Sequence, residues 1–155
     1  MAGDVQVRRR RFLAGAAAAA AGAALPSRAQ EVQDITPMLD KITRGVKPRR
    51  SGVEIELPQI AENGNSVPMR IRVASPMSAE DHVKAIYIFA ERNPRPLIAT
   101  FHLGPHSGRA EISTRVRLAG TQRVTVLAEL TKDRFLVGPA DVLVTSAACM
   151  DEATL

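Results

Sequence analysis

Apolar and polar residues alternate with a period of two in several short runs between residues 53 and 145, and this alternation constrains the fold more than any other feature. It is cleanest at 67–74, where Met69, Ile71 and Val73 fall on one face and arginines on the other. Successive side chains of a β-strand point to opposite faces, so each run predicts a strand with one buried face.

Turn signals separate the runs at intervals of about ten residues, which is the spacing expected for an all-β sandwich. The predicted strands are 53–57, 67–74, 83–91, 97–103, 109–118, 123–130, 134–137 and 141–145. Asn63-Gly64 is the clearest turn, between the first two strands. No strand–helix–strand periodicity is present, so we predict an immunoglobulin-like antiparallel β-sandwich. The Trp and paired cysteines of antibody domains are absent, and the likeness is therefore one of architecture.

A short helix is predicted ahead of the strands. Four apolar residues recur there with helical spacing on one face: Ile35, Met38, Leu39 and Ile42. Thr36 is the expected N-cap, with Pro37 at the first helical position and Gly45 at the end. A polar linker at 47–52 then leads to the first strand.

The first 29 residues predict an export signal. Arg9 and Arg10 stand in a basic head, an Ala/Gly run follows at 14–24, and Ser27-Arg28-Ala29 supplies a small-x-small end. Paired arginines at this position are typical of the twin-arginine route, with cleavage expected after the last of these residues. The apolar part is too short and too rich in alanine to span a bilayer of about 30 Å.

Removal of this signal changes the charge of the protein. The full chain has a net charge of +5, but loss of five arginines and Asp4 leaves 16 basic and 15 acidic residues. The remaining chain is therefore nearly neutral, and neither nucleic acid nor a lipid surface is expected as a partner. We divide it into a helix and linker at 30–51, a sandwich at 52–145 and a flexible C-terminal arm at 146–155.

Cys149 is the only cysteine and lies beyond the last predicted strand. It has no partner for an intramolecular disulfide, and the chain from Val144 to Cys149 can extend about 17 Å. Two interpretations stay open from the residues alone. The thiol either reaches into a pocket on another protein, or belongs to a terminal segment without a role.

Few other residues suggest chemistry. His82, His102 and His106 are the only histidines, and the last two flank Gly104-Pro105. With Cys149 and Met150 they would form a soft ligand set suited to copper. Nothing in the sequence brings that cysteine to the histidines, so no metal and no cofactor are expected. Nucleotide-binding, hydrolase and metalloprotease motifs are absent from the sequence, and no enzymatic activity is predicted.

From about Gly52 onward the chain resembles the SoxY family, the sulfur-carrying subunits of periplasmic thiosulfate oxidation. The resemblance is carried by these segments: 57–68, 75–77, 81–84, 88–91 with Asn93-Pro94, 99–102 and 113–122. It implies an immunoglobulin-like sandwich that pairs with a second small β-sandwich subunit, SoxZ. It also implies a C-terminal arm that carries sulfur intermediates covalently between partner enzymes, with Cys149 at the position of the carrier cysteine.

The arm departs from the family pattern, which usually ends Gly-Gly-Cys-Gly-Gly. Here Ala147-Ala148 precede the cysteine and Met150-Asp151 follow it, with Glu152 to Leu155 added. Acidic residues near the thiol should raise its pKa and repel an anionic adduct. Two functions are therefore expected as alternatives: a covalent sulfur carrier, or a scaffold subunit that keeps the sandwich and its partner interface without loading sulfur.

Overall fold

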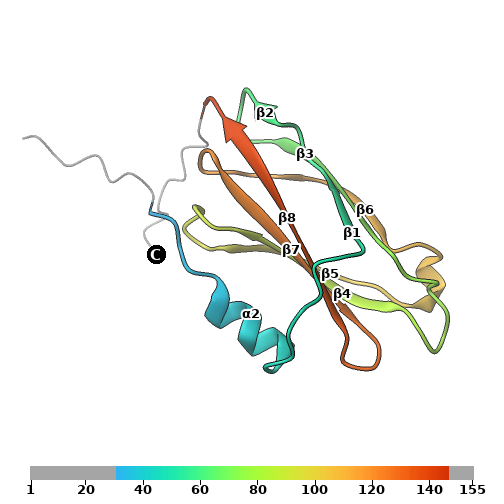
Figure 1. The fold of residues 1–155 in the computed structure, drawn as a ribbon. Helices are drawn as coiled ribbons and strands as arrows, with labels where there is room; N and C mark the ends of the chain where they lie inside the picture. The colour runs from blue at the N-terminus through green and yellow to red at the C-terminus, as the bar shows by residue number, and fades with distance from the viewer. Residues whose placement is uncertain (1–30, 147–155) are drawn as a thin grey trace, which may run out of the picture.

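The computed structural model describes residues 31–146 as two β-sheets packed face to face, with one helix against the larger sheet (Figure 1). The elements in order are α2 (Thr36–Thr43), β1 (Val53–Glu56), β2 (Ile60–Ala61), β3 (Val67–Val73), β4 (Val83–Ala90), β5 (Leu97–His102), the 3-10 turn η1 (Pro105–Ser107), β6 (Glu111–Val116), β7 (Gln122–Leu130) and β8 (Phe135–Val144). The smaller sheet has the order β1-β3-β6 and the larger β2-β8-β7-β4-β5. The predicted β-sandwich is confirmed.

The main core lies between the sheets and is almost wholly aliphatic. Along β3, the alternate residues Val67, Met69, Ile71 and Val73 are buried and the residues between them face outward. Buried residues of the larger sheet contribute the facing layer, among them Ile86, Ile88, Val124 and Val126. The period-two pattern therefore identified the inward face of β3 correctly.

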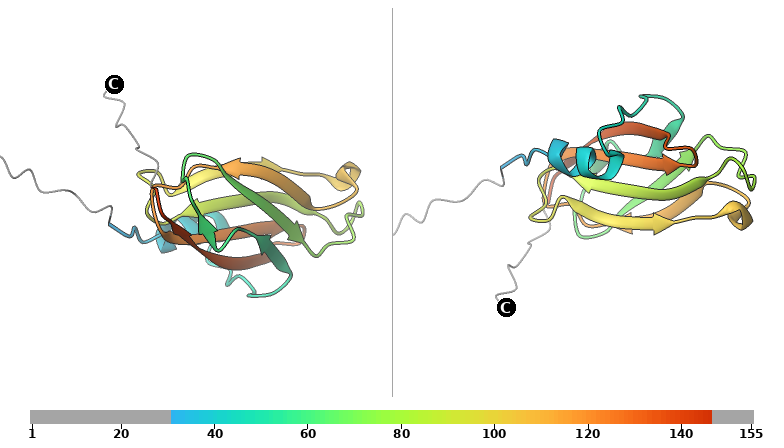
Figure 2. Two further views of the ribbon diagram at one scale, coloured as in Figure 1. Left: turned by 90° about the horizontal axis from the view of Figure 1, so that it is seen from above. Right: turned by 90° about the horizontal axis from the view of Figure 1, so that it is seen from below.

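Helix α2 covers a second apolar cluster on the outer face of the larger sheet (Figure 2). This cluster consists of Ile35, Phe89, Leu127 and Phe135, with Leu39, Ile42, Tyr87 and Val137 packed against it. The predicted N-cap is wrong by one residue, because the cap is Ile35 and the upstream Asp34 carboxylate accepts the Thr36 N–H at 2.9 Å. Arg44, with a left-handed φ of 55°, and Gly45, with φ of 81°, end the helix.

β8 is one continuous strand of ten residues, which corrects the prediction of two strands at 134–137 and 141–145. Gly138-Pro139 does not interrupt it. A Cβ on Gly138 would lie 3.1 Å from the Cβ of Val53, so the glycine allows β1 to approach closely. Pro139 pairs with Thr125 of β7 in a part of β8 that has a strand on one side only, where proline is tolerated.

β2 was not predicted. It pairs in parallel with the end of β8, with Ile60 opposite Leu143 and Ala61 opposite Val144. The chain between β1 and β3 therefore crosses to the larger sheet and returns. The linker at 47–52 is also bound to the sheet, since Arg49 exchanges backbone hydrogen bonds of 2.9 Å with β8. No helix within residues 31–146 is long and apolar enough to cross a membrane.

Candidate functional site

The residues that the sequence singled out for function, Arg9, Arg10 and Cys149, lie outside the described residues. The last described residue, Ser146, stands three positions before the cysteine. What the structure defines is how the chain is held where it leaves the sandwich. We call this the arm end of the sandwich, and the opposite end, where β8 begins, the far end.

Hydrogen bonds follow the chain beyond the last strand. Thr145 donates its backbone N–H to the carbonyl of Ala61 at 3.0 Å and its hydroxyl to the carbonyl of Glu62 at 3.1 Å. The N–H of Gly64 then donates to the carbonyl of Ser146 at 2.8 Å. The chain is therefore held two residues past β8, within three residues of the thiol.

Thr121, on the loop before β7, holds the chain from the other side. Its hydroxyl oxygen accepts the N–H of Val144 at 2.9 Å and lies 3.3 Å from the carbonyl oxygen of Val144, to which it can donate. The groups that hold residues 144–146 form what we call the exit collar: Ala61, Glu62, Gly64 and Thr121.

The turn that supplies Gly64 is itself fixed. The Asn63 side chain accepts the N–H of Asn65 at 2.8 Å, and the carbonyl of Gly64 accepts the N–H of Leu118 at 2.8 Å. Asn63-Gly64 was predicted as a turn, and a turn is present. Its contact with Ser146 could not be predicted, because it joins residues 82 positions apart.

A buried amide pair fixes the loops beside the collar. Asn93 is 2% exposed; its Nδ2 donates to the carbonyl of Arg117 at 2.8 Å, and its Oδ1 accepts the N–H of Ala119 and Nε2 of Gln122, both at 3.0 Å. Oε1 of Gln122 accepts the N–H of Arg92 at 2.9 Å. The β4–β5 and β6–β7 loops are thereby joined through two side chains. Sequence analysis treated Asn93 only as part of a turn and missed this role.

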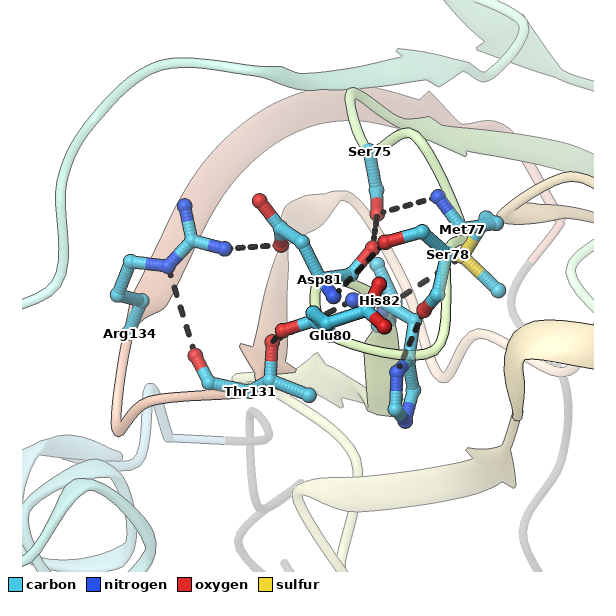
Figure 3. Close-up of polar contacts among 9 residues, drawn as sticks. Ser75, Met77, Ser78, Glu80, Asp81, His82, Thr131 and Arg134 are labelled. Carbon is cyan, nitrogen blue, oxygen red and sulfur yellow. Dashed lines mark hydrogen bonds and ion pairs between the residues drawn. The ribbon is translucent and has the colours of Figure 1, made fainter.

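The far end contains a polar cluster of its own (Figure 3). Its members are Ser75, Met77, Ser78, Glu80, Asp81, His82, Thr131 and Arg134. Asp81 forms an ion pair with Arg134, Nδ1 of His82 donates to the carbonyl of Ser78 at 3.1 Å, and the N–H of Thr131 donates to the carbonyl of His82 at 3.0 Å. The Asp81–Arg134 and Thr131–His82 contacts join the β3–β4 loop to the β7–β8 turn, and the His82–Ser78 bond fixes the loop itself, so the cluster is structural.

The other two histidines lie apart from this cluster. His102 is exposed on β5 and His106 is exposed in η1. Within residues 31–146 no group of three or more histidine, cysteine or acidic side chains is close enough to hold a metal ion. Cys149 and Met150, the other two members of the ligand set considered above, lie outside the described residues.

Glu129 on β7 is a largely buried carboxylate, with its side chain 14% exposed. Lys84 Nζ lies 2.7 Å from it, the Tyr87 hydroxyl 3.1 Å and the Arg44 guanidinium 3.6 Å. Partial burial opposes ionisation, but hydrogen bonds from Lys84 and Tyr87 outweigh it, and the pKa of Glu129 is lowered. Burial, followed by the bond to Glu129, raises the pKa of Tyr87. The group connects the end of α2 to the sheet and is structural.

Comparisons with known proteins give a consistent result. The family model described as sulfur oxidation protein SoxY matches residues 40–149. The solved structure of the sulfur carrier protein SoxY from Chlorobium limicola f thiosulfatophilum is 26% identical, with a TM-score of 0.59 over 70% of this chain and 89% of that one. No curated protein matches the chain.

Other solved structures share only the fold. Superoxide reductase (neelaredoxin) from Ignicoccus hospitalis is 14% identical, with a TM-score of 0.53 over 61% of this chain and 80% of that one. Superoxide reductase from Nanoarchaeum equitans is 15% identical, with a TM-score of 0.50 over 63% and 95%. At this identity the likeness concerns the sandwich and carries no inference about chemistry.

Proposed function

Because the chain belongs to the SoxY family of sulfur oxidation proteins, we propose that it is a sulfur carrier that binds its cargo covalently through Cys149. One observation supports this above others: the family match continues beyond the last strand and ends on that cysteine. The exit collar holds the chain until three residues before the thiol, so the body of the protein presents a short reach of chain to a partner.

The chemistry required of the carrier itself is small. Coupling of the Cys149 thiolate to a sulfur compound such as thiosulfate forms a disulfide-type bond and releases two electrons, which a redox partner enzyme takes up. Other partner enzymes later break that bond, by hydrolysis or by thiol exchange. The groups that hold the exit are backbone amides, carbonyls and hydroxyls, which position the chain and supply neither a proton nor a nucleophile. We therefore assign the protein the role of a carrier subunit, with the redox and hydrolytic chemistry left to its partner enzymes.

Partners and location follow from the same proposal. Arg9 and Arg10 direct export to the periplasm by the twin-arginine route, and the sandwich pairs there with a SoxZ-like subunit. Replacing Arg9→Lys and Arg10→Lys should leave precursor in the cytoplasm. Sizing the purified chain with a SoxZ-like subunit should show a hetero-complex, and an unchanged monomer at micromolar concentration would contradict the pairing.

Intact-mass measurement tests the carrier function directly. Protein recovered from thiosulfate-exposed periplasm should carry added mass that a reductant removes, and Cys149→Ser should abolish it completely. The same variant should keep its unfolding temperature and its partner binding, because the position lies beyond the last strand. Protein that never gains mass, although its partner enzymes are active, would contradict the carrier.

The scaffold is the second candidate, and the residues around Cys149 favour it. Met150 and Asp151 add bulk and negative charge beside the thiol where the family usually has glycine, and Glu152 adds a second negative charge beyond the family pattern. A scaffold would bind the partner subunit with the same affinity whether position 149 is cysteine or serine, and would show no mass change in either form.

A further inference from the structure

A groove lies beside β3 on the smaller sheet. β1 ends at Glu56 opposite Arg70, while β3 begins three residues earlier at Val67, so the first residues of β3 have no strand on that side. The groove has a volume of about 790 Å³. Its walls include the apolar residues Leu57, Pro58, Pro68 and Met69.

The charges on this groove are unequal. Its charged lining residues are Glu56, Arg70 and Arg115. Glu56 is bound by Arg72 at 2.6 Å and lies 3.7 Å from Arg70. Arg115 has no ion pair with any acidic residue in the described part of the chain; its Nε donates to the Ser66 hydroxyl at 2.6 Å. The groove therefore offers one unneutralised cation at its Ser66 side.

That side adjoins the exit collar. Ser146 is hydrogen-bonded to Gly64, and Ser66, two residues further along, is hydrogen-bonded to Arg115. Only two hydrogen bonds and two residues of chain separate the last described residue from the guanidinium. The six residues from Ala147 to Glu152 can extend about 20 Å, which is longer than the connection from Ser146 through Gly64 and Ser66 to the Arg115 guanidinium.

The sequence of the arm complements the groove. Asp151 and Glu152 supply negative charge for Arg115, and Met150 supplies an apolar side chain of the kind that fits irregular surfaces. We propose that residues 147–155 dock in this groove, with Asp151 and Glu152 against Arg115, so that Cys149 is held beside the Ser66–Arg115 contact.

Docking has a functional consequence that rests on the carrier function above. The docked thiol lies against the body and is withdrawn from partner enzymes, and an enzyme must compete with the groove for the arm. Because the ion pairs are exposed, they are screened by salt, so docking weakens as ionic strength rises.

Disulfide trapping in the full-length chain tests the position of the arm without any sulfur cargo. Ser66→Cys places a second thiol beside Arg115, and Leu143→Cys places one at an exposed position of β8, away from the groove. In a glutathione redox buffer, the stability of each disulfide with Cys149 reports how often the arm visits that place. Asp151→Asn with Glu152→Gln removes the arm's charge without changing its length.

We expect the charge-neutral arm to weaken the disulfide at position 66 about three- to tenfold at low salt, since two exposed ion pairs are lost. The disulfide at position 143 should not weaken, and Arg115→Gln should reproduce the effect at position 66. Equal changes at both positions, no change at either, or disulfides between two chains would each overturn docking. Loss of sulfur loading with trapping intact would instead contradict the carrier function alone.

Discussion

The two ends of the sandwich are built by similar means and serve different purposes. At each, a side chain of one segment bonds the backbone of another: Thr131 at the far end, Asn93 and Thr121 at the arm end. At the far end both joined segments return to the sheets. At the arm end one of them, the chain after β8, continues toward Cys149.

This difference separates stability from function. A contact at the far end affects only how firmly the fold is held. A contact in the exit collar also decides how much chain lies between the body and the thiol. Substitutions at the two ends should therefore divide into those that change stability alone and those that also change the behaviour of Cys149.

The largest effect is expected for Asn93→Ala at the arm end. It leaves the N–H of Ala119 without its acceptor and the carbonyl of Arg117 without its donor, and removes one of the two acceptors of the Gln122 amide. We expect the free energy of unfolding to fall by about 3 kcal/mol. Urea denaturation measures this loss. Ser75→Ala at the far end is the matched control and should cost much less, so equal losses would remove the distinction between the ends.

Thr121→Val keeps the shape of the side chain and removes the hydroxyl that bonds Val144. We expect a loss of about 1–2 kcal/mol, because a backbone N–H loses its acceptor. Amide exchange at Val144 and Thr145 should become faster, and Cys149 alkylation should change with it. Unaltered exchange at these two amides would mean that Thr121 is not part of the collar.

Glu129→Gln removes the charge that Lys84 and Tyr87 bind, near the far end of the larger sheet. It should lower the free energy of unfolding by about 1 kcal/mol at neutral pH, and the loss should depend on pH. The folded-state pKa of Glu129 is lowered, so its contribution is present above the ordinary value near 4.5 and is lost as pH falls through the folded value. The stability difference from the unmodified protein should therefore shrink in acid. Sulfur loading at neutral pH should be unchanged.

The smallest effect is expected for Asp81→Asn combined with Arg134→Gln. The pair is partly exposed, and such pairs contribute about 0.2–1 kcal/mol. Thermal unfolding should shift slightly, and neither sulfur loading nor the alkylation rate of Cys149 should respond. A change in either would show that the far end communicates with the arm.

Local patterns in the sequence predicted the parts of the fold that depend on neighbouring residues. The buried face of β3 and the apolar face of α2 follow from periods of two and 3.6, and Gly45 ends the helix as expected. Gly138-Pro139 led to the wrong prediction of two strands in place of β8. The glycine is explained by the close approach of Val53, a contact between strands far apart in the sequence that local patterns do not show.

The collar could not be predicted for the same reason. Gly64 meets Ser146 only after β2 has joined β8, a two-residue parallel pairing with no periodicity to reveal it. Asn93 is identified by its burial and by three bonds to the β6–β7 loop and the start of β7, which the local sequence Asn93-Pro94 does not encode. The sequence predicts Cys149 as the site, and that stays a prediction; the groups that hold the chain before it could be found only in the structure.

The unbroken course of β8 has a mechanical consequence. An enzyme that grips the thiol and withdraws would pull along the axis of this strand, whose bonds to β7 run perpendicular to the pull over eight paired residues. Force in that direction loads the whole ladder in shear, so its bonds must fail together rather than open one after another. The sandwich should therefore stay folded under a pulling force that would unfold a sheet whose hydrogen bonds broke one after another.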